Sequence, residues 1–416
     1  MRRFWIHLKK EPVFLLFLFI LIILSAIYPD KVVNYPSFVD WRTIVALTGL
    51  VVITNGAKES GYLRSISMGV LERLRTERHL AIFFILLSAA LSTFLTNDVA
   101  LLIVVPLTVE LQGLIKNNIT KIAIFEAIAA NVGSSLTPIG NPPNLFLWHQ
   151  WGISFLTFIM KLLPLFTVLM GFLLLYTHMI FKPRKVVRLH QPELKGAEEG
   201  RHVGSPSEQI SKPENQHDEA LMIFSCILLI IYVVSIEMGF VNYFLPLVLI
   251  LYLLFYREVL LTADWLLLML FIIIFIDIHI ISTTPLISGL TKRIDLSSGG
   301  NVFIFSAIIS QIMSNVPASV FVAKFTQNWF AITYGVNVGG NGIITASLAN
   351  IIALRLASQV DQVGDARDME TDVKIAESAK GEGGANLWLE FHKYSLPYFL
   401  VSVAVIHWLF FGILGF

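Results

Sequence analysis

The sequence predicts an all-α polytopic membrane protein with two inverted-topology repeats, each containing a re-entrant hairpin and a discontinuous helix. Hydrophobic residues make up 56% of the 416 residues, charged residues make up 14%, and the mean hydropathy is +0.73. A typical soluble domain has about 45–50% apolar and about 25% charged residues. Long uncharged runs also recur along the chain, and the two halves present similar polar motifs in the same order. A soluble fold of this length cannot bury so much apolar surface, so we expect a bilayer to cover the rest.

Composition and short motifs exclude several other classes of protein. The net charge is +1, so the sequence predicts no basic nucleic-acid-binding face and no nucleic-acid partner. Cys226 is the only cysteine, which excludes an internal disulfide, a four-cysteine zinc site and an iron–sulfur cluster. The phosphate-binding, zincin and serine-hydrolase motifs GxxxxGK[ST], HExxH and GxSxG do not occur. We therefore expect neither an enzyme nor a resident cofactor.

The uncharged runs predict nine membrane-spanning helices. A spanning helix needs about 20 mainly apolar residues, within a range of roughly 17–25. The first run follows the basic segment 1–10 and lacks the short core and small-residue cleavage site of a signal peptide, so we interpret it as an uncleaved helix. In chain order, the predicted spans are 12–29, 41–57, 121–147, 162–181, 219–236, 240–256, 264–281, 331–356 and 395–415.

Two further apolar stretches, 80–113 and 301–325, have a different pattern. Each consists of two short runs on either side of a polar tip, which reads Thr96-Asn97-Asp98 in the first stretch and Ser314-Asn315 in the second. An arm of about 14 residues reaches only about 21 Å as a helix. Because such an arm is too short to cross the bilayer core, we expect each stretch to be a re-entrant hairpin.

The distribution of Lys and Arg predicts the orientation in the membrane. Cytoplasmic loops carry an excess of these residues. With the N-terminus inside, the predicted inner segments hold 24 of the 30 Lys and Arg residues. We therefore expect a multi-pass protein of the cell (inner or plasma) membrane with a cytoplasmic N-terminus and an external C-terminus. The polar segments 183–218 and 358–390 are expected to be flexible cytoplasmic loops, and 62–78 an amphipathic interfacial helix.

Matched motifs predict an internal repeat. Asp-Trp opens one span in each half, at Asp40 and Asp264, and Asn-Val-Gly begins a polar break in each half, at Asn131 and Asn337. Each repeat has four crossings, so one joining helix inverts the second repeat, and the two hairpin tips are expected to meet near the membrane midplane. The alternative is chance similarity between short apolar strings. We assign residues 1–182 to the first repeat, 183–218 to the linker, 219–239 to the joining helix and 240–416 to the second repeat.

The polar breaks are candidate binding elements. Proline and glycine residues between Asn131 and Asn144 prevent a regular helix, and glycines after Asn337 do the same in the second half. Backbone groups freed in this way are tolerated in a bilayer only where they face protein or a polar cavity, and they can bind an ion or a substrate there. The alternative is a structural kink that binds nothing. The candidate site residues in the breaks are Ser135, Thr137, Gly140, Asn141 and Asn144 in the first, and Asn341, Thr345 and Asn350 in the second.

The hairpin tips supply the remaining candidates. Thr96, Asn97, Ser314 and Asn315 offer neutral oxygens and amides that suit a partly dehydrated Na⁺ or the oxygens of an anion. Asp98 adds a carboxylate, and an ionisable group within the bilayer is a functional candidate by default. It either binds Na⁺, takes up a proton, or caps the returning helix. The sequence thus predicts a Na⁺ site at Asn97, Asp98 and Asn315.

Other ionisable residues have less specific interpretations. Asp277 and His279 lie in the span 264–281, where they either relay protons or occupy its watery outer end. Glu110, Glu126, Lys324 and Arg355 fall near predicted helix ends and are expected to extend toward water, with a functional role as the alternative.

The Thr-Asn-Asp tip at 96–98, with the later Thr-Pro-x-Gly-Asn-Pro-x-Asn string at 137–144, resembles the ion-transporter superfamily. This group includes arsenite-efflux permeases, a type of sodium–proton antiporter, and citrate and dicarboxylate–sodium symporters, and the resemblance covers nearly the whole chain. It implies two inverted repeats that work by elevator-like alternating access, often in a homodimer. By position, it implies that Thr96, Asn97, Ser314 and Asn315 are tip ligands and that Thr137, Gly140, Asn141, Asn144, Asn341 and Thr345 line the site.

The tips also differ from one branch of that superfamily. Dicarboxylate symporters of this kind have Ser-Asn-Thr at both tips, whereas this chain has Thr-Asn-Asp and Ser-Asn-Val, closer to the arsenite-permease pattern. Asp98 would repel a dicarboxylate unless a cation or proton neutralises it. We therefore expect secondary active transport of a small anion or metalloid oxyacid, coupled to H⁺ or Na⁺. The alternatives are a sodium–proton antiporter, a di- or tricarboxylate–sodium symporter, and a passive channel; an ATPase partner, known for some arsenite permeases, has no recognisable signature here.

Overall fold

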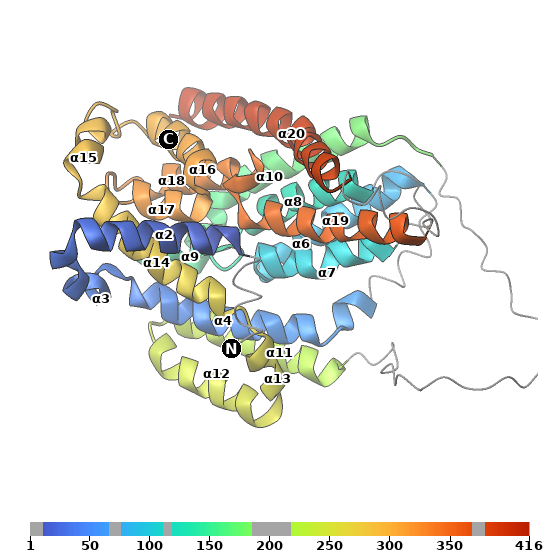
Figure 1. The fold of residues 1–416 in the computed structure, drawn as a ribbon, viewed down its shortest axis with the longest axis horizontal. Coiled ribbons are helices and arrows are strands. Elements are labelled where there is room, and N and C mark those ends of the chain that lie inside the picture. Colours follow the sequence, from blue (N-terminus) through green and yellow to red (C-terminus); the bar gives the residue numbers. More distant parts are fainter. Residues whose placement is uncertain (1–10, 66–75, 111–118, 185–217, 368–378, 416) are drawn as a thin grey trace, which may run out of the picture.

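The computed structural model describes residues 11–65, 76–110, 119–184, 218–367 and 379–415 (Figure 1), and most of these residues lie in helices. This confirms the all-α membrane architecture. The helices are α2 (Pro12–Ile27), η1 (Pro29–Asn34), α3 (Tyr35–Phe38), α4 (Trp41–Glu59), α6 (Glu77–Phe94), α7 (Asn97–Glu110), α8 (Ile119–Ser134), α9 (Pro142–Trp151), α10 (Phe155–Ile180), α11 (Glu219–Glu237), α12 (Val241–Phe255), α13 (Arg257–Thr262), α14 (Trp265–Ser282), α15 (Pro285–Thr291), α16 (Gly299–Met313), α17 (Asn315–Val322), α18 (Trp329–Gly339), η2 (Ile344–Ala346), α19 (Leu348–Arg367), α20 (Ala379–Ile406) and η3 (His407–Ile413).

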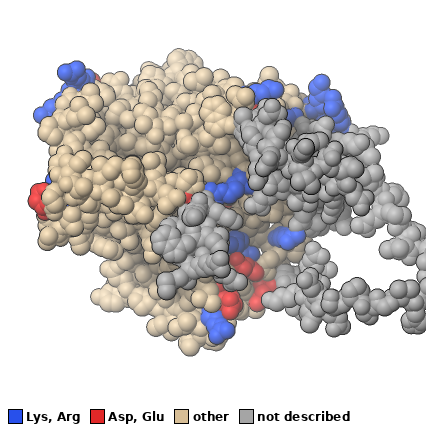
Figure 2. Space-filling model, in the orientation of Figure 1, with Lys and Arg blue, Asp and Glu red and all other residues tan. Residues whose placement is uncertain are grey.

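The surface of the molecule fits a bilayer. On the face in Figure 2, charged side chains gather at the left edge and toward the right, and the broad region between them carries almost none. Large apolar side chains on the joining helix α11 and on α12 are exposed, among them Ile230, Tyr243 and Leu254. Such a surface is stable in lipid and would aggregate in water. The chain is therefore a multi-pass membrane protein.

Both predicted hairpins form, although their arms differ in length. α6 has 18 residues and α7 has 14, whereas α16 has 15 and α17 has 8. At about 1.5 Å per residue, α6 is about 27 Å long, which exceeds the predicted arm. The first turn nevertheless lies beside the break in the following helix, because the Asn97 backbone N–H donates to the Gly140 carbonyl at 3.0 Å.

The two discontinuous helices break where the sequence predicts. The first consists of α8 and α9, with residues 135–141 between them, and the second consists of α18 and α19, with 340–347 between them. Asn141 caps the restarted helix in the first half, since its side chain accepts a hydrogen bond from the Asn144 N–H. A side-chain acceptor at a helix N-terminus satisfies a donor that the break leaves free.

The two halves contact each other through matched pairs of equivalent helices. The first helix of each half packs on the second helix of the other half, so α2 lies against α14 and α12 lies against α4. The returning arm of each hairpin packs on the restarted helix of the other half, so α7 lies against α19 and α17 lies against α9. Equivalent indole groups make the same local bond, from Trp41 to the Pro36 carbonyl and from Trp265 to the Leu260 carbonyl, both at 2.8 Å. These matched contacts support the interpretation of two repeats.

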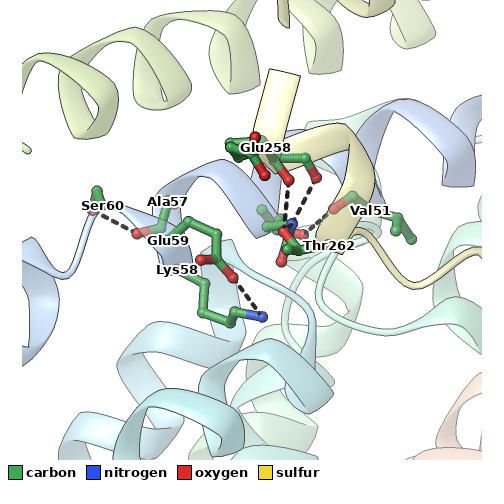
Figure 3. Close-up of polar contacts among 10 residues, drawn as sticks. Val51, Ala57, Lys58, Glu59, Ser60, Glu258 and Thr262 are labelled. Carbon is green, nitrogen blue, oxygen red and sulfur yellow. Dashed lines mark hydrogen bonds and ion pairs between the residues drawn. The ribbon is translucent and has the colours of Figure 1, made fainter. Parts of the chain in front are cut away.

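The short helix α13 anchors the second half to α4. The Asn55 amide on α4 donates to the Val259 carbonyl and to the Thr262 hydroxyl, both at 2.9 Å. Figure 3 shows Thr262 and Glu258 beside this end of α4, where Lys58 and Glu59 form an ion pair of 3.2 Å. The sequence placed these residues between the predicted spans 240–256 and 264–281 and did not predict a helix there.

Several predicted boundaries need correction. α10 begins at Phe155 rather than at 162, and the segment 358–390, expected to be a flexible loop, is helical at both described ends, in α19 and α20. Polar residues can continue a helix beyond the membrane because its backbone hydrogen bonds are internal. Most of the predicted interfacial helix 62–78 and most of the linker 183–218 lie outside the described residues.

Candidate functional site

Both hairpin turns line one small cavity, which we call the central cavity. Its volume is about 30 Å³. The first turn contributes Asn97 and Asp98, the second contributes Ser314 and Asn315, and the second break contributes Ser347. Apolar side chains of α2 and α14 form much of the remaining wall, together with prolines at the start of α9. The two tips thus meet, as the sequence analysis expected.

Asp98 is the one charged side chain among the described residues that line the central cavity. It is 9% exposed, and its Oδ1 atom has no hydrogen-bond partner in the described structure. Removing a carboxylate from water without compensation is unfavourable by several kcal/mol or more. A cation or a proton would supply the missing compensation at this position.

The other polar side chains that line the cavity carry neutral oxygens and amides, whose oxygens are suitable ligands for a hard cation. The described residues contain no group of three or more His, Cys, Asp or Glu side chains that could hold a metal ion. A Na⁺ ion here would therefore rely on Asp98 together with neutral groups such as Asn97 and Asn315.

Ser314 adopts an unusual backbone conformation at the second tip. Its φ is 73° and its ψ is 155°, in the region that favours glycine. A non-glycine residue there costs on the order of 1–3 kcal/mol and is often found at functional sites. The conformation begins α17 at the cavity wall, and the Ser314 hydroxyl donates to the Ala346 carbonyl at 3.3 Å.

Asparagines behind the cavity join the two halves by matched hydrogen bonds. The Asn131 amide donates to Asn350 Oδ1 at 2.9 Å, and its counterpart Asn337 donates to Asn144 Oδ1 at 2.7 Å. Asn97 Nδ2 also donates to Asn131 Oδ1, at 3.2 Å. We call Asn131, Asn144, Asn337 and Asn350 the asparagine brace. Their amides are engaged with protein groups, so these side chains hold the breaks in position rather than lining the central cavity.

Most other predicted site residues also support the break without lining the cavity. Asn141 donates to Asn337 Oδ1 at 2.9 Å, and Asn341 donates to the Asn337 carbonyl at 3.1 Å. The Thr137 hydroxyl donates to the Thr93 carbonyl, and the Ser135 hydroxyl to the Val132 carbonyl, both at 2.6 Å. Thr96 and Gly140 are likewise absent from the cavity wall, although Gly140 receives the Asn97 N–H.

Thr345 requires a correction. It lies in the short helix η2 and its side chain is exposed, whereas Ala346 and Ser347 are buried. In a tight 3₁₀ turn, successive side chains point in directions about one-third of a turn apart, so only part of the segment faces the interior. Ser347, two residues later, lines the cavity instead.

Burial of two carboxyl groups corrects the prediction that Glu126 extends toward water and excludes the watery outer end as the position of Asp277. Glu126 lies in the middle of α8 and is fully buried, where Thr108 donates a hydrogen bond to it, so it does not extend toward water. Asp277 on α14 is also fully buried, and neither of its carboxylate oxygens has a partner in the described structure. The sequence placed both within apolar runs but did not show which helix face each occupies.

Comparisons with known proteins agree on a family. A family model described as "Citrate transporter" matches residues 4–353. The chain is 35% identical over 399 residues to the inner membrane protein YbiR of Escherichia coli, which covers 96% of this chain and 95% of YbiR. It is 34% identical over 360 residues to an uncharacterised transporter of Methanocaldococcus jannaschii, covering 85% of this chain and 91% of that protein. A putative transporter of Dictyostelium discoideum, arsB, is 27% identical over 124 residues, 29% of this chain and 22% of arsB.

Proposed function

The chain belongs to the citrate transporter family, and from this premise we propose that it is a secondary active transporter of a small anion or metalloid oxyacid, coupled to Na⁺ or H⁺ by alternating access. The coupling cation binds in the central cavity, and Asp98 is the charged group that holds it. The protein resides in the cell membrane with its N-terminus in the cytoplasm and its C-terminus outside, and it works as a homodimer. No enzymatic step is part of this proposal.

The observation that carries the proposal is the composition of the central cavity. Polar groups from both hairpin turns and from the second break converge there, and Asp98 is the charged member among the described lining residues. A lone carboxylate among neutral oxygens attracts a cation. The bound cation then neutralises the charge of Asp98, so that an anion next to it is no longer repelled. Binding of cation and anion would thus depend on each other, which is the thermodynamic requirement for coupling.

The size of the cavity supports a conformational cycle. A volume of about 30 Å³ accommodates a water molecule or an ion, since about 10–15 Å³ on this measure suffices for one water. A multi-atom anion does not fit without movement. The site is too narrow for such a substrate in this arrangement, and substrate binding requires the hairpins and the walls on α2 and α14 to separate.

A sodium–proton antiporter is the second candidate function. It is favoured by one feature: the described residues that line the central cavity include no Lys, Arg or His to bind an anion. Purified protein in vesicles distinguishes the two functions. Dissipation of a pH gradient by Na⁺ in the absence of any added anion would indicate antiport, whereas anion uptake that requires the gradient would indicate symport or anion exchange.

The direct test is Asp98→Asn in vesicles with imposed Na⁺ or pH gradients and a panel of citrate, succinate, phosphate and arsenite. We expect the natural protein to accumulate at least one of these solutes and the variant to lose gradient-driven accumulation by at least tenfold. Glu258→Gln is the matched control, because Glu258 is 74% exposed and pairs with the adjacent Arg257 at 3.5 Å. Unchanged gradient-driven uptake in the Asp98 variant would remove Asp98 from the mechanism.

A further inference from the structure

We propose that Asp277 is a second cation site, which binds a proton on the α14 wall and is separate from the site at Asp98. The proposal rests on the proposed function, because it assigns a proton to the same transport cycle. The Asp277 side chain has no polar contact in the described structure. Asp277 is fully buried, and both carboxylate oxygens lack a hydrogen-bond partner in the described structure. An acid that stabilised the fold would be expected to make such bonds.

The neighbouring elements supply no counter-charge. α14 packs against α2, α3, α4, α15 and α17, and its Phe275 ring lies 5.6 Å from the Phe146 ring on α9. α2, α15 and α17 contain no titratable side chain within their bounds. The titratable residues of the other three are Tyr35 on α3, His149 on α9 and, near the ends of α4, Arg42, Lys58 and Glu59. Asp277 makes a hydrogen bond with none of them.

Charged groups at the outer end of α14 are engaged elsewhere. His279, two residues after Asp277, stacks on Phe38 with ring centroids 3.9 Å apart. Lys31 donates to the Thr283 hydroxyl at 3.0 Å, at the end of the helix. Lys324, just after α17, also makes no hydrogen bond with Asp277. Among the described residues, no ion is therefore paired with the buried carboxyl, and it is stable in this position when it carries a proton.

Asp277 continues the helix face that lines the central cavity. Leu270 and Ile274 line the cavity from α14, and Asp277 follows them by seven and three residues. Residues with this spacing lie on one side of a helix, and three residues correspond to about 4.5 Å along its axis. Asp277 thus lies about one turn beyond the cavity, in the direction of the Lys31–Thr283 contact. A cavity that shifted along this face would reach Asp277.

A proton fits this position better than Na⁺. Hard metal cations require several oxygen ligands at once. The helix face before Asp277 presents Leu270 and Ile274, and the facing helix α2 has the sequence PVFLLFLFILIILSAI, whose single hydroxyl, on Ser25, donates to the Leu21 carbonyl. A proton needs only one carboxylate oxygen. The Asp98 cavity, with its neutral oxygens, is the site with the chemistry for Na⁺.

Infrared difference spectroscopy tests proton binding without a substrate. Full-length protein in lipid vesicles is titrated between alkaline and acidic D₂O buffers, and the carbonyl bands of protonated carboxylic acids are recorded. We expect one band from a buried acid to be lost in Asp277→Asn and to shift in Asp277→Glu. Asp98→Asn and Glu126→Gln identify the bands of the other buried acids, and Glu258→Gln, at an exposed site, should leave every buried-acid band unchanged.

Isotope labelling keeps the test informative if the Asp277 variants do not fold. With ¹³C-labelled aspartate in the Asp98→Asn chain, a buried-acid band that moves to lower frequency must come from another aspartate, and Asp277 is the fully buried one in the described structure. Retention of every band in a folded Asp277→Asn protein, or no isotope-shifted band in the labelled chain, would overturn the proposal. The spectra report proton binding alone, so they are independent of the transport assay with Asp98→Asn. Asp277 can bind a proton in a protein that shows no gradient-driven uptake, and a protein that transports can lack a proton on Asp277.

Discussion

Gly140 shows how one residue can fix the relation between a hairpin turn and a break. A Cβ atom added to Gly140 would lie 2.4 Å from the backbone oxygen of Ser134, and the Gly140 carbonyl accepts the Asn97 N–H. Real Cβ atoms do not approach a backbone oxygen so closely, so the break would have to open. We expect Gly140→Ala to lower the stability by about 1–3 kcal/mol and to impair transport, as measured by thermal unfolding in detergent and by vesicle uptake.

Gly171 on α10 provides the matched control for this substitution. It is exposed, and an added Cβ would meet nothing within 4 Å. Alanine favours a helix over glycine by about 0.8–1.0 kcal/mol, so Gly171→Ala should keep or raise the unfolding temperature. Equal destabilisation by the two variants would show that the close approach at Gly140 has no energetic effect.

Residue type alone predicted the polar character of the site but not which side chains face the cavity. Asn144 and Asn350 were predicted as ligands because each follows a break at the same interval after an Asn-Val-Gly motif. In the structure they accept hydrogen bonds from the other half, through Asn337 and Asn131. An asparagine can serve either purpose, and its partners lie 193 and 219 residues away in the sequence. No local pattern contains that information.

At the scale of elements, the asparagine brace predicts that the two discontinuous helices stabilise each other. The pair Asn337–Asn144 joins α18 to α9, and both side chains are buried. Removing one partner of a buried hydrogen bond costs about 1–3 kcal/mol, and residues in direct contact show coupling energies of about 0.5–3 kcal/mol. We expect Asn337→Ala and Asn144→Ala each to be destabilising and the double variant to lose less than the sum, measured by chemical or thermal unfolding.

Asn301 offers a control for that cycle. Its amide donates to the Asp295 carbonyl at 3.0 Å, and the residue is exposed in the first turn of α16. Asn301→Ala should change stability by no more than about 0.5 kcal/mol and should be additive with Asn337→Ala. Additive losses for the Asn337–Asn144 pair as well would contradict a direct energetic link between the two breaks.

Element types were largely predictable, whereas element ends were not. Proline and glycine between 135 and 142 predict the first break because they remove backbone donors or resist ordering, and α8 ends at Ser134. The helical ends of 358–390 were missed because charge and glycine content indicates solvent exposure, not the absence of a helix. Likewise, the apolar run containing Asp277 predicted a span, but burial of that acid depends on the helices that surround α14.

At the scale of the whole molecule, the central question is whether the two hairpins enter from opposite faces of the membrane. The Glu77 N–H donates to the Arg184 carbonyl at 2.9 Å, so Lys182 marks the end of the molecule at which α6 begins. Ser297 lies two residues before α16 and marks the start of the second hairpin. In Figure 1, α3 and α15 lie at the left-hand end, and the starting end of α11 and the final turns of α19 lie toward the right. Single cysteines at these positions report the side of each hairpin.

Cys226, the only native cysteine, is first replaced by alanine, and single cysteines are then introduced at Lys182, Glu258, Asn34 or Ser297, all of which are exposed. The excess of Lys and Arg in the predicted inner segments predicts that Lys182 and Glu258 face the cytoplasm. A membrane-impermeant maleimide added to intact cells should therefore label the Asn34 and Ser297 variants, and it should label the Lys182 and Glu258 variants only after permeabilisation. The reverse pattern would keep the inverted repeats and reverse the orientation. Labelling of Lys182 and Ser297 from the same side would mean that both hairpins enter from one face, and the two halves would then not be inverted repeats.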